Sequence, residues 1–288
     1  MSEIKKVAVI GAGTMGSQIA LQTAYSGTYQ VSVVDSLPQQ LERAEAQNRR
    51  LVARAVERGR RSQEEAEAAL AAITYASDLP ATVAGADLVI EAVPENLEIK
   101  LAVWKDLASA ARPDAILASN SSTIAISRLA GASGRPEQCC NMHFFHPVTV
   151  MELCEVVRGP ATSDATIEAA VRFVESIGRV PVVLKKEVHG FIANRILFAA
   201  SEEALHLLEG GYATAQDIDT AVKKGLNWPM GPFELLDFSG LDIFVGAMED
   251  RARAEGGSGA PRLLKDMVAR GELGRKTGKG FYDYGEKT

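Results

Sequence analysis

The fold is decided by a short stretch near the start of the chain, Val7-Ala8-Val9-Ile10-Gly11-Ala12-Gly13-Thr14-Met15-Gly16. The apolar, β-branched run predicts a strand, the G-x-G-x-x-G spacing predicts a tight turn, and the residues that follow predict a helix. Gly11 allows the turn, Gly13 lets the backbone approach a pyrophosphate, and Gly16 lets the helix pack against the strand. The helix N-terminus presents free N–H groups to an anion. The stretch therefore predicts a dinucleotide-binding loop.

An acidic residue supports this interpretation. A second predicted strand, residues 31–34, ends at Asp35, about twenty residues after the glycines, where a carboxylate binds the ribose 2′-hydroxyl of NAD. The same carboxylate would repel the 2′-phosphate of NADP, so NAD is favoured as the cofactor. The alternative is a glycine turn that opens a helix and binds nothing, and Asp35 argues against it.

The composition is that of an ordinary globular protein of 288 residues, enough for one large domain or two smaller ones. Its net charge of -6 argues against nucleic acid and anionic membranes as partners. The cysteines, Cys139, Cys140 and Cys154, form no C-x-x-C pair, which argues against a cysteine-ligated zinc site and a disulfide framework. We expect no metal site. We also expect no signal peptide and no membrane span, and therefore a cytoplasmic protein.

Residues 39–72 are predicted to form a helical hairpin. Gly59 ends the first helix, and Ser62-Gln63-Glu64-Glu65 has the form of a capping box for the second. Arg50, Arg54 and Arg58 recur every four residues and so share one helix face. This basic stripe is either a solvated face or a seat for the phosphates of a long anionic substrate, and the sequence leaves both open.

Polar residues follow a later strand. Strands are predicted at residues 87–92 and 115–118, and the second runs into Ser119-Asn120-Ser121-Ser122-Thr123. In open α/β sheets, ligands bind beyond the carboxyl ends of the strands, which makes this turn a candidate binding element. The alternative is that these residues only cap the next helix.

Residues 140–157 carry the candidate chemistry. Two short strands are predicted there with Pro147 at the turn between them, an arrangement that would bring His143 and Glu155 together. A histidine held by a carboxylate is suited to act as a general base near neutral pH. A histidine among apolar residues can equally be a structural group, and the pattern alone does not decide between the two.

The whole set of motifs resembles the L-3-hydroxyacyl-CoA dehydrogenase family over nearly the entire chain, most of all its short single-function 3-hydroxybutyryl-CoA dehydrogenase members. The residues that carry the resemblance are the glycine stretch with Asp35, Glu91-Ala92-Val93-Pro94-Glu95-Asn96 with Lys100, Ser119-Asn120-Ser121-Ser122, His143-Phe144-Phe145 with Glu155, Gly190-Phe191-Ile192-Ala193-Asn194-Arg195, and Lys276-Thr277-Gly278-Lys279-Gly280-Phe281-Tyr282. Several motifs in the family's order are far more specific than any one of them.

The resemblance implies NAD-dependent oxidation of a 3-hydroxyacyl thioester. It implies that His143 takes the proton of the 3-hydroxyl while C3 gives a hydride to NAD, and that Glu155 orients His143. Ser122 would bond the reacting oxygen, and Asn194 would hold the substrate in register. The further residues implied at the cofactor are Glu95, Lys100, Ser122, His146 and Lys276, and those suggested for the acyl-CoA phosphates are Arg54 and Arg58.

Two residues depart from the family pattern. His146 stands where the family usually has Asn, and it either tunes substrate or cofactor preference or replaces one hydrogen-bonding group by another. His189 stands where Pro is common, so it is either a flexible, titratable hinge residue or an ordinary loop histidine. Neither change removes an essential group, and we expect an active enzyme.

The predicted fold class is α/β, with a Rossmann-like, mostly parallel, doubly wound sheet that carries the helical hairpin as an insertion. This NAD-binding domain is expected to span residues 1–185, with its last strand at residues 180–184. An all-α domain is expected over residues 186–288, beginning with a long helix from Phe191 to Glu209 and another that starts at Thr214. The resemblance implies that the second domain binds substrate and forms a homodimer.

Two other functions are compatible with parts of the sequence. A relative that oxidises a hydroxyacyl group on an acyl carrier protein would have the same catalytic residues. A non-enzymatic NAD sensor would need to have lost one of them, whereas His143, Glu155, Ser122 and Asn194 are all present. Short-chain dehydrogenases are excluded because the chain has no Y-x-x-x-K.

Overall fold

The computed structural model describes residues 3–285 and forms two compact units, Met1–Phe191 and Ile192–Thr288. The division falls somewhat later in the chain than the expected boundary at Lys185. None of the helices within residues 3–285 combines the length and the apolar character needed to cross a bilayer.

The first unit is built on one sheet of eight strands in the order β3-β2-β1-β4-β5-β6-β7-β8. Neighbouring strands are parallel except β6 and β7, which are antiparallel. The strands are β1 (Lys6–Ile10), β2 (Gln30–Val34), β3 (Ile73–Ala76), β4 (Leu88–Glu91), β5 (Ile116–Ser119), β6 (Cys139–Phe144), β7 (Leu153–Arg158) and β8 (Val180–Leu184). This confirms the predicted mostly parallel, Rossmann-like fold class.

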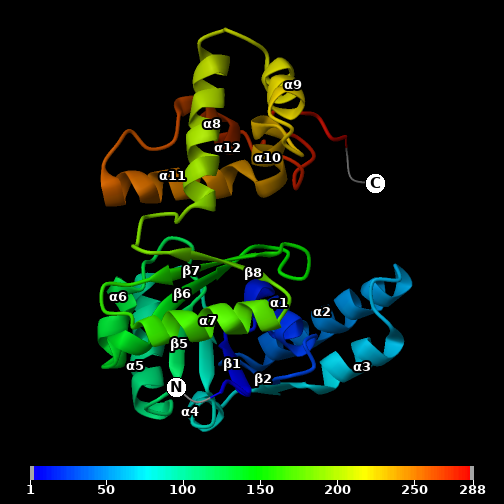
Figure 1. Cartoon of the computed structure of the whole chain (residues 1–288). Helices are drawn as coiled ribbons and strands as arrows, with labels where there is room; N and C mark the ends of the chain where they lie inside the picture. Colours follow the sequence, from blue (N-terminus) through cyan, green and yellow to red (C-terminus); the bar gives the residue numbers. More distant parts are fainter. Residues whose placement is uncertain (1–2, 286–288) are drawn as a thin grey trace. The chain divides into compact units, whose positions relative to one another are not determined.

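Helices cover both faces of this sheet (Figure 1). Alternate residues of β1 enter two separate cores: Val7 and Val9 pack in one, Ala8 and Ile10 in the other. A parallel strand buried on both faces needs such a continuous apolar run, which is why the first strand was predictable. The helices of this unit are α1 (Thr14–Ala24), α2 (Pro38–Glu57), α3 (Gln63–Ala71), α4 (Leu79–Val83), α5 (Leu97–Ala110), α6 (Ser127–Ala130) and α7 (Asp164–Ser176).

The predicted helical hairpin is confirmed as α2 and α3. The capping box is complete, since Ser62 Oγ accepts from the Glu65 N–H at 3.1 Å and Glu65 Oε2 accepts from the Ser62 N–H at 2.8 Å. The hairpin packs on α1 through residues that include Leu41, Ala44 and Val52. It extends from the side of the sheet formed by β2 and β3 (Figure 1).

The second unit is all helical, as expected. Its helices are α8 (Ala193–Glu209), α9 (Ala215–Gly225), α10 (Pro232–Ser239), α11 (Leu241–Glu255) and α12 (Arg262–Ala269). Their apolar faces meet in one core around Leu205, Phe233, Leu236 and Leu264. The predicted N-cap of α9 is confirmed, because the Thr214 side chain accepts from the Asp217 N–H at 3.2 Å.

The expected start of the long helix at Phe191 is wrong, because α8 begins at Ala193. Gly190 and Phe191 have φ values of 74° and 52°, so two consecutive residues lie in the left-handed region. A right-handed helix cannot include them. Phe191 is also 1% exposed and packs in a small core with Val157 and Leu184, which explains why an apolar residue stands before the helix.

Candidate active site

The glycine loop lies between β1 and α1, at the carboxyl ends of the parallel strands. A Cβ on Gly16 would stand 1.9 Å from the Gly11 carbonyl oxygen, so only glycine lets α1 approach the turn this closely. Gly13, by contrast, has open space where its Cβ would be, with nothing within 4 Å. The start of α1 has no side-chain cap, which leaves its first N–H groups to a ligand. This cradle fits a pyrophosphate.

Asp35 follows β2 and lies beside this loop. Its Oδ2 accepts from the Ala12 N–H at 2.9 Å and its Oδ1 accepts from the Leu37 N–H at 2.9 Å. The two bonds fix the carboxylate next to the first turn, where a ribose hydroxyl can donate to it. The structure thus brings the two parts of the predicted NAD fingerprint together.

His143 and Glu155 lie opposite each other on the antiparallel strands β6 and β7. His143 Nδ1 and Glu155 Oε2 are 2.8 Å apart, and both side chains are buried. Because a carboxylate accepts a hydrogen bond, Nδ1 carries the proton and Nε2 has its lone pair free. Within residues 3–285, Nε2 has no hydrogen-bond partner. The predicted pairing is therefore confirmed as geometry, and the role of His143 as a base stays a prediction.

Aromatic side chains enclose the imidazole of His143. The centroids of the Phe145 and Phe191 rings lie 4.4 Å and 5.5 Å from the centroid of His143. His146 follows in the same loop and is exposed by accessible area, but partial desolvation of its ring lowers its pKa below the ordinary value. An imidazole at this position is therefore neutral at neutral pH and can both donate and accept a hydrogen bond, as the amide of an Asn can.

Ser122 lies in the loop after β5, the strand between β4 and β6. The register places Ser119 beside Glu91 on one side and Asn141 on the other, so Ser122 follows β5 at the end of the sheet where His143 lies near the carboxyl end of β6. The Phe144 N–H donates to Asn120 Oδ1 at 2.9 Å and ties this loop to β6. In the described part of the chain, the Ser122 side chain has no hydrogen-bond partner.

The loop after β4 contains Glu95. Its Oε2 lies 3.3 Å from Lys100 Nζ, and its Oε1 accepts from Ser121 and Thr123. Lys100, which was expected beside the nicotinamide, is only 1% exposed and also pairs with Glu91 at 2.7 Å. Direct contact between Lys100 and a cofactor stays a prediction, and its charge acts on this region through Glu95.

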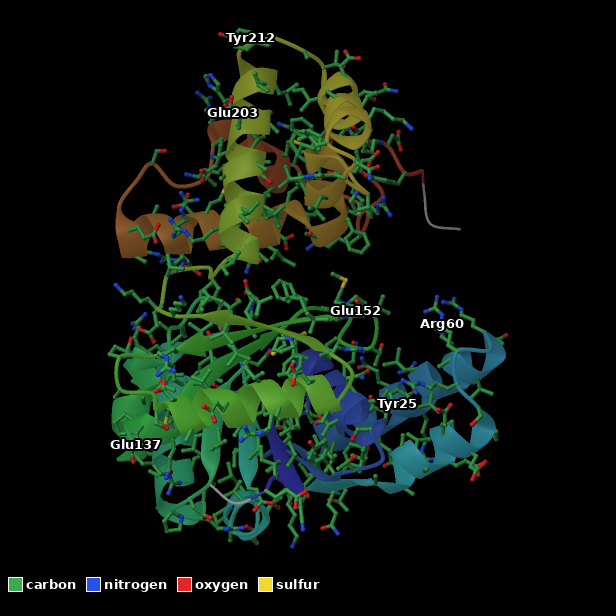
Figure 2. The ribbon with its side chains drawn as sticks, viewed as in Figure 1. Tyr25, Arg60, Glu137, Glu152, Glu203 and Tyr212 are labelled. Carbon is green, nitrogen blue, oxygen red and sulfur yellow. The ribbon has the colours of Figure 1, made fainter. Side chains whose placement is uncertain are left out.

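The basic stripe forms part of a pocket. Arg54 and Arg58 line it together with Arg60, Arg61 and Tyr25, and residues 147, 149 and 150 of the loop after His146 close one side. Figure 2 shows Tyr25 and Arg60 on this side of the first unit. Arg50 is not among the lining residues, and its Nε instead donates to the Ala46 carbonyl at 3.3 Å.

The pocket carries unneutralised positive charge. Arg61 stacks over the Tyr25 ring at 4.6 Å and pairs with Glu65 at 3.5 Å. Among residues 3–285, Arg54, Arg58 and Arg60 pair with no carboxylate. Sequence reasoning missed Arg60, Arg61 and Tyr25, although two further arginines directly after Gly59 were a visible signal.

Three further residues singled out in the sequence are Asn194, Lys276 and His189. Asn194 is near the start of α8 and Lys276 forms an ion pair with Asp242, both in the second unit. Their roles at the active site stay predictions. His189 lies in the turn before Gly190 and is partly buried.

The cysteines take no part in this arrangement. Cys139, Cys140 and Cys154 are buried and unbridged, and burial raises the pKa of Cys139 to about 11. A neutral, buried thiol is a poor nucleophile. No group of His, Cys, Asp or Glu side chains within residues 3–285 could hold a metal ion.

A dinucleotide loop with its acid and a carboxylate-held histidine, both at the carboxyl ends of one sheet, define an NAD-dependent oxidoreductase. Comparison with known proteins specifies the class further. A family model described as the NAD binding domain of 3-hydroxyacyl-CoA dehydrogenase matches residues 6–188, and one described as the C-terminal domain matches residues 190–284.

Individual relatives agree with these matches. A probable 3-hydroxybutyryl-CoA dehydrogenase of Bacillus subtilis is 39% identical over 289 residues, with 99% of each chain covered. The mitochondrial hydroxyacyl-coenzyme A dehydrogenase of Homo sapiens is 40% identical, with 98% of this chain and 91% of that protein covered. The crystal structure of (S)-3-hydroxybutyryl-CoA dehydrogenase from Ralstonia eutropha superposes with a TM-score of 0.92 at 36% identity, covering 99% of this chain and 100% of that one.

The chain belongs to the 3-hydroxyacyl-CoA dehydrogenase family. It is an oxidoreductase of fatty acid metabolism that binds NAD and catalyses NAD-dependent 3-hydroxyacyl-CoA dehydrogenation. The family and the cofactor expected from the motifs are thereby confirmed.

Proposed function

We propose that this enzyme interconverts (S)-3-hydroxyacyl-CoA and 3-oxoacyl-CoA with His143 as the general base. The observation that carries the proposal is the 2.8 Å contact between His143 Nδ1 and Glu155 Oε2, which leaves Nε2 as the acceptor. His143 Nε2 takes the proton of the 3-hydroxyl, and Glu155 stabilises the imidazolium that forms. In the reductive direction, the same imidazolium returns the proton to the 3-oxo oxygen.

Ser122 donates a hydrogen bond to the reacting oxygen in this proposal. Its hydroxyl lies at the end of the sheet where His143 lies, and negative charge develops on that oxygen as the proton leaves. The glycine loop and Asp35 hold the cofactor, with Glu95 on the same side of the sheet. The nicotinamide, when bound, would supply the hydride-accepting chemistry at C3, and the residues of the chain would supply the proton transfer and the positioning.

The proposed substrate is a short acyl chain on CoA. Relatives named as 3-hydroxybutyryl-CoA dehydrogenases support the short chain. The pocket of Arg54, Arg58 and Arg60 supports the CoA, because guanidinium groups without an acid partner bind phosphates strongly. A phosphopantetheine arm on an acyl carrier protein offers one phosphate, whereas CoA offers three, and this difference favours CoA.

The second unit completes the proposed enzyme. Asn194 would hold the substrate, Lys276 would contact the cofactor, and a second copy of the chain would pair through this unit. Exposed apolar side chains on its helices support the pairing, since Ile196, Phe238 and Ile243 are 58%, 56% and 61% exposed. Sedimentation analysis tests this part, with a dimer as the expected state and a monomer as the contrary one.

The reaction is tested with purified protein, NADH and acetoacetyl-CoA. We expect loss of nicotinamide absorbance and formation of the (S) alcohol, and we expect kcat/KM to fall as the acyl chain is lengthened. The same acetoacetyl group on an acyl carrier protein serves as the competitor. Turnover of the carrier-protein thioester alone would favour the biosynthetic alternative, and no turnover of either would contradict the proposal.

A further inference from the structure

Glu91 is a buried acid with no direct role in the proposed reaction. It ends β4, is 0% exposed, and accepts hydrogen bonds at both oxygens. Oε1 accepts from Lys100 Nζ at 2.7 Å and from the Val93 N–H at 2.8 Å. Oε2 accepts from Ser119 Oγ at 2.7 Å and from Trp104 Nε1 at 3.4 Å. Burying a carboxylate is costly, and these four donors offset that cost and hold the side chain in place.

Lys100 links this acid to a second one. Its ammonium, 1% exposed, lies between Glu91 and Glu95, which are 2.7 Å and 3.3 Å away, and also donates to the Val93 carbonyl at 3.2 Å. Burial alone raises the pKa of Glu95, but the Lys100 ammonium and the hydroxyl and N–H donors from Ser121 and Thr123 bring that pKa below its ordinary value. Glu95 is therefore charged and bound on two sides.

Glu95 in turn holds the loop that contains Ser122. Its Oε1 accepts from Ser121 Oγ, from the Thr123 N–H at 3.0 Å and from Thr123 Oγ1 at 2.8 Å. These two residues flank Ser122 in the chain. The carboxylate thus fixes the loop on both sides of the serine, while the Ser122 hydroxyl keeps its hydrogen-bonding capacity.

The start of the same loop is fixed by Glu91 itself. Ser119 donates to the Glu91 side chain, and the Asn120 N–H donates to the Glu91 carbonyl at 2.8 Å. Asn120 Oδ1 then accepts from the N–H of Phe144, the residue after His143. Glu91 therefore holds the start of the serine loop directly, and Asn120 of that loop contacts the end of the strand that carries the histidine.

We propose that Glu91 is a positioning residue for the dehydrogenation, acting through Lys100 and Glu95 to hold the Ser122 hydroxyl at the reacting oxygen. The proposal rests on the proposed function of Ser122. Preorganised donors lose little energy to reorientation during the reaction, so a loop held in this way raises kcat more than it lowers KM.

The test compares Glu91→Gln in two backgrounds, the unmodified enzyme and Ser122→Ala. Gln keeps the shape but removes the charge that holds Lys100 and Ser119. We expect kcat to fall at least tenfold, while KM for NAD changes less than about threefold. In the Ser122→Ala background the same change should lower kcat less than about twofold, because residues that act through one group are not additive.

Asp87→Asn is the matched control, because Asp87 precedes β4 at the opposite end of the strand. Asp87 pairs with Arg112 at 2.6 Å and accepts from the Lys5 and Lys6 N–H groups at 2.9 Å. This variant should lower the melting temperature and leave kcat unchanged. Ser119→Ala provides a milder variant that leaves no unpaired charge, with a smaller loss of kcat that again depends on Ser122.

Two results would overturn the proposal: an unchanged kcat in folded Glu91→Gln, or the same fold-loss with and without Ser122. An equal loss of kcat in Asp87→Asn would show that strand stability alone is responsible. Failure of the proposed function is a separate outcome, since the unmodified enzyme would then not turn over acetoacetyl-CoA.

Discussion

At the scale of one residue, the contacts of His143 determine which nitrogen of its ring is available to the substrate. Glu155 accepts a hydrogen bond from Nδ1–H, so Nε2 is the ring atom of His143 that can accept a proton. Phe145 and Phe191 pack on the ring, which limits the orientations that it can adopt. The imidazole of His143 is therefore held in one tautomer and one orientation, as the proposed general base requires.

His146 is predicted to make stability depend on pH. Partial desolvation lowers its pKa in the folded chain, so below the ordinary value of 6.5 the unfolded chain takes up a proton that the folded chain resists. Its contribution to the free energy of unfolding is present above about pH 6.5 and is lost as the pH falls through the folded-state pKa. In urea unfolding, the wild type should lose stability relative to His146→Asn between about pH 8 and about pH 5. Parallel pH curves for the two proteins would contradict this.

At the scale of elements, the glycine loop between β1 and α1 contains one glycine needed for packing and another available for binding. Gly16 is enclosed by backbone, whereas Gly13 faces open space and has a φ of -70°, which alanine tolerates. The structure therefore confirms the packing role expected for Gly16 and leaves space at Gly13 for the expected pyrophosphate.

Gly13→Ala and Gly16→Ala are predicted to behave oppositely. Gly13→Ala should leave the melting temperature nearly unchanged and raise KM for NAD at least tenfold, because the new methyl group occupies the place of the pyrophosphate. Gly16→Ala should lower the free energy of unfolding by about 1–3 kcal/mol through overpacking. Thermal unfolding and NAD titration of both variants check this, and equal destabilisation by both would refute a binding role for Gly13.

Elements were largely predictable where they repeat a simple pattern. The apolar run of β1, the capping box at Ser62 and the pairing of His143 with Glu155 all follow from local spacing or from one turn. The start of α8 was not predictable in this way, because the left-handed Phe191 is held by burial in a core rather than by its own propensity.

The anchors of the site were less predictable. Glu91 and Lys100 are nine residues apart in sequence, and nothing in composition says that both are buried. A charged residue closing an otherwise apolar strand was the one available signal for Glu91. The arginines after Gly59 were missed as pocket residues because they lie beyond the periodic part of the helix, where a face cannot be assigned from spacing.

At the scale of the whole molecule, the charge in one pocket is opposite in sign to the net charge of the chain. The chain has a net charge of -6, yet Arg54, Arg58 and Arg60 line one pocket. A local basic patch attracts an anionic ligand even on a protein whose net charge is negative. This distribution suits a substrate that carries several phosphates at one end.

Reversing the charge of Arg54 and Arg58 together, each to Glu, is predicted to raise KM for the CoA ester at least tenfold with kcat within about twofold. Arg49→Glu is the matched control, because Arg49 belongs to the same helix, pairs with Glu45 and does not line the pocket. Steady-state kinetics at low and high salt check the result. An unchanged KM, or an equal rise in the control, would argue against CoA binding in this pocket.

The most direct test of the proposed reaction is the turnover of acetoacetyl-CoA and NADH by His143→Gln, measured together with its affinity for NADH. We predict that kcat falls at least about 10²-fold, while the Kd for NADH stays within about threefold and the protein remains folded. Turnover within tenfold of the wild type would contradict the assignment of His143 as the base. Loss of the folded state in place of turnover would make His143 a structural residue.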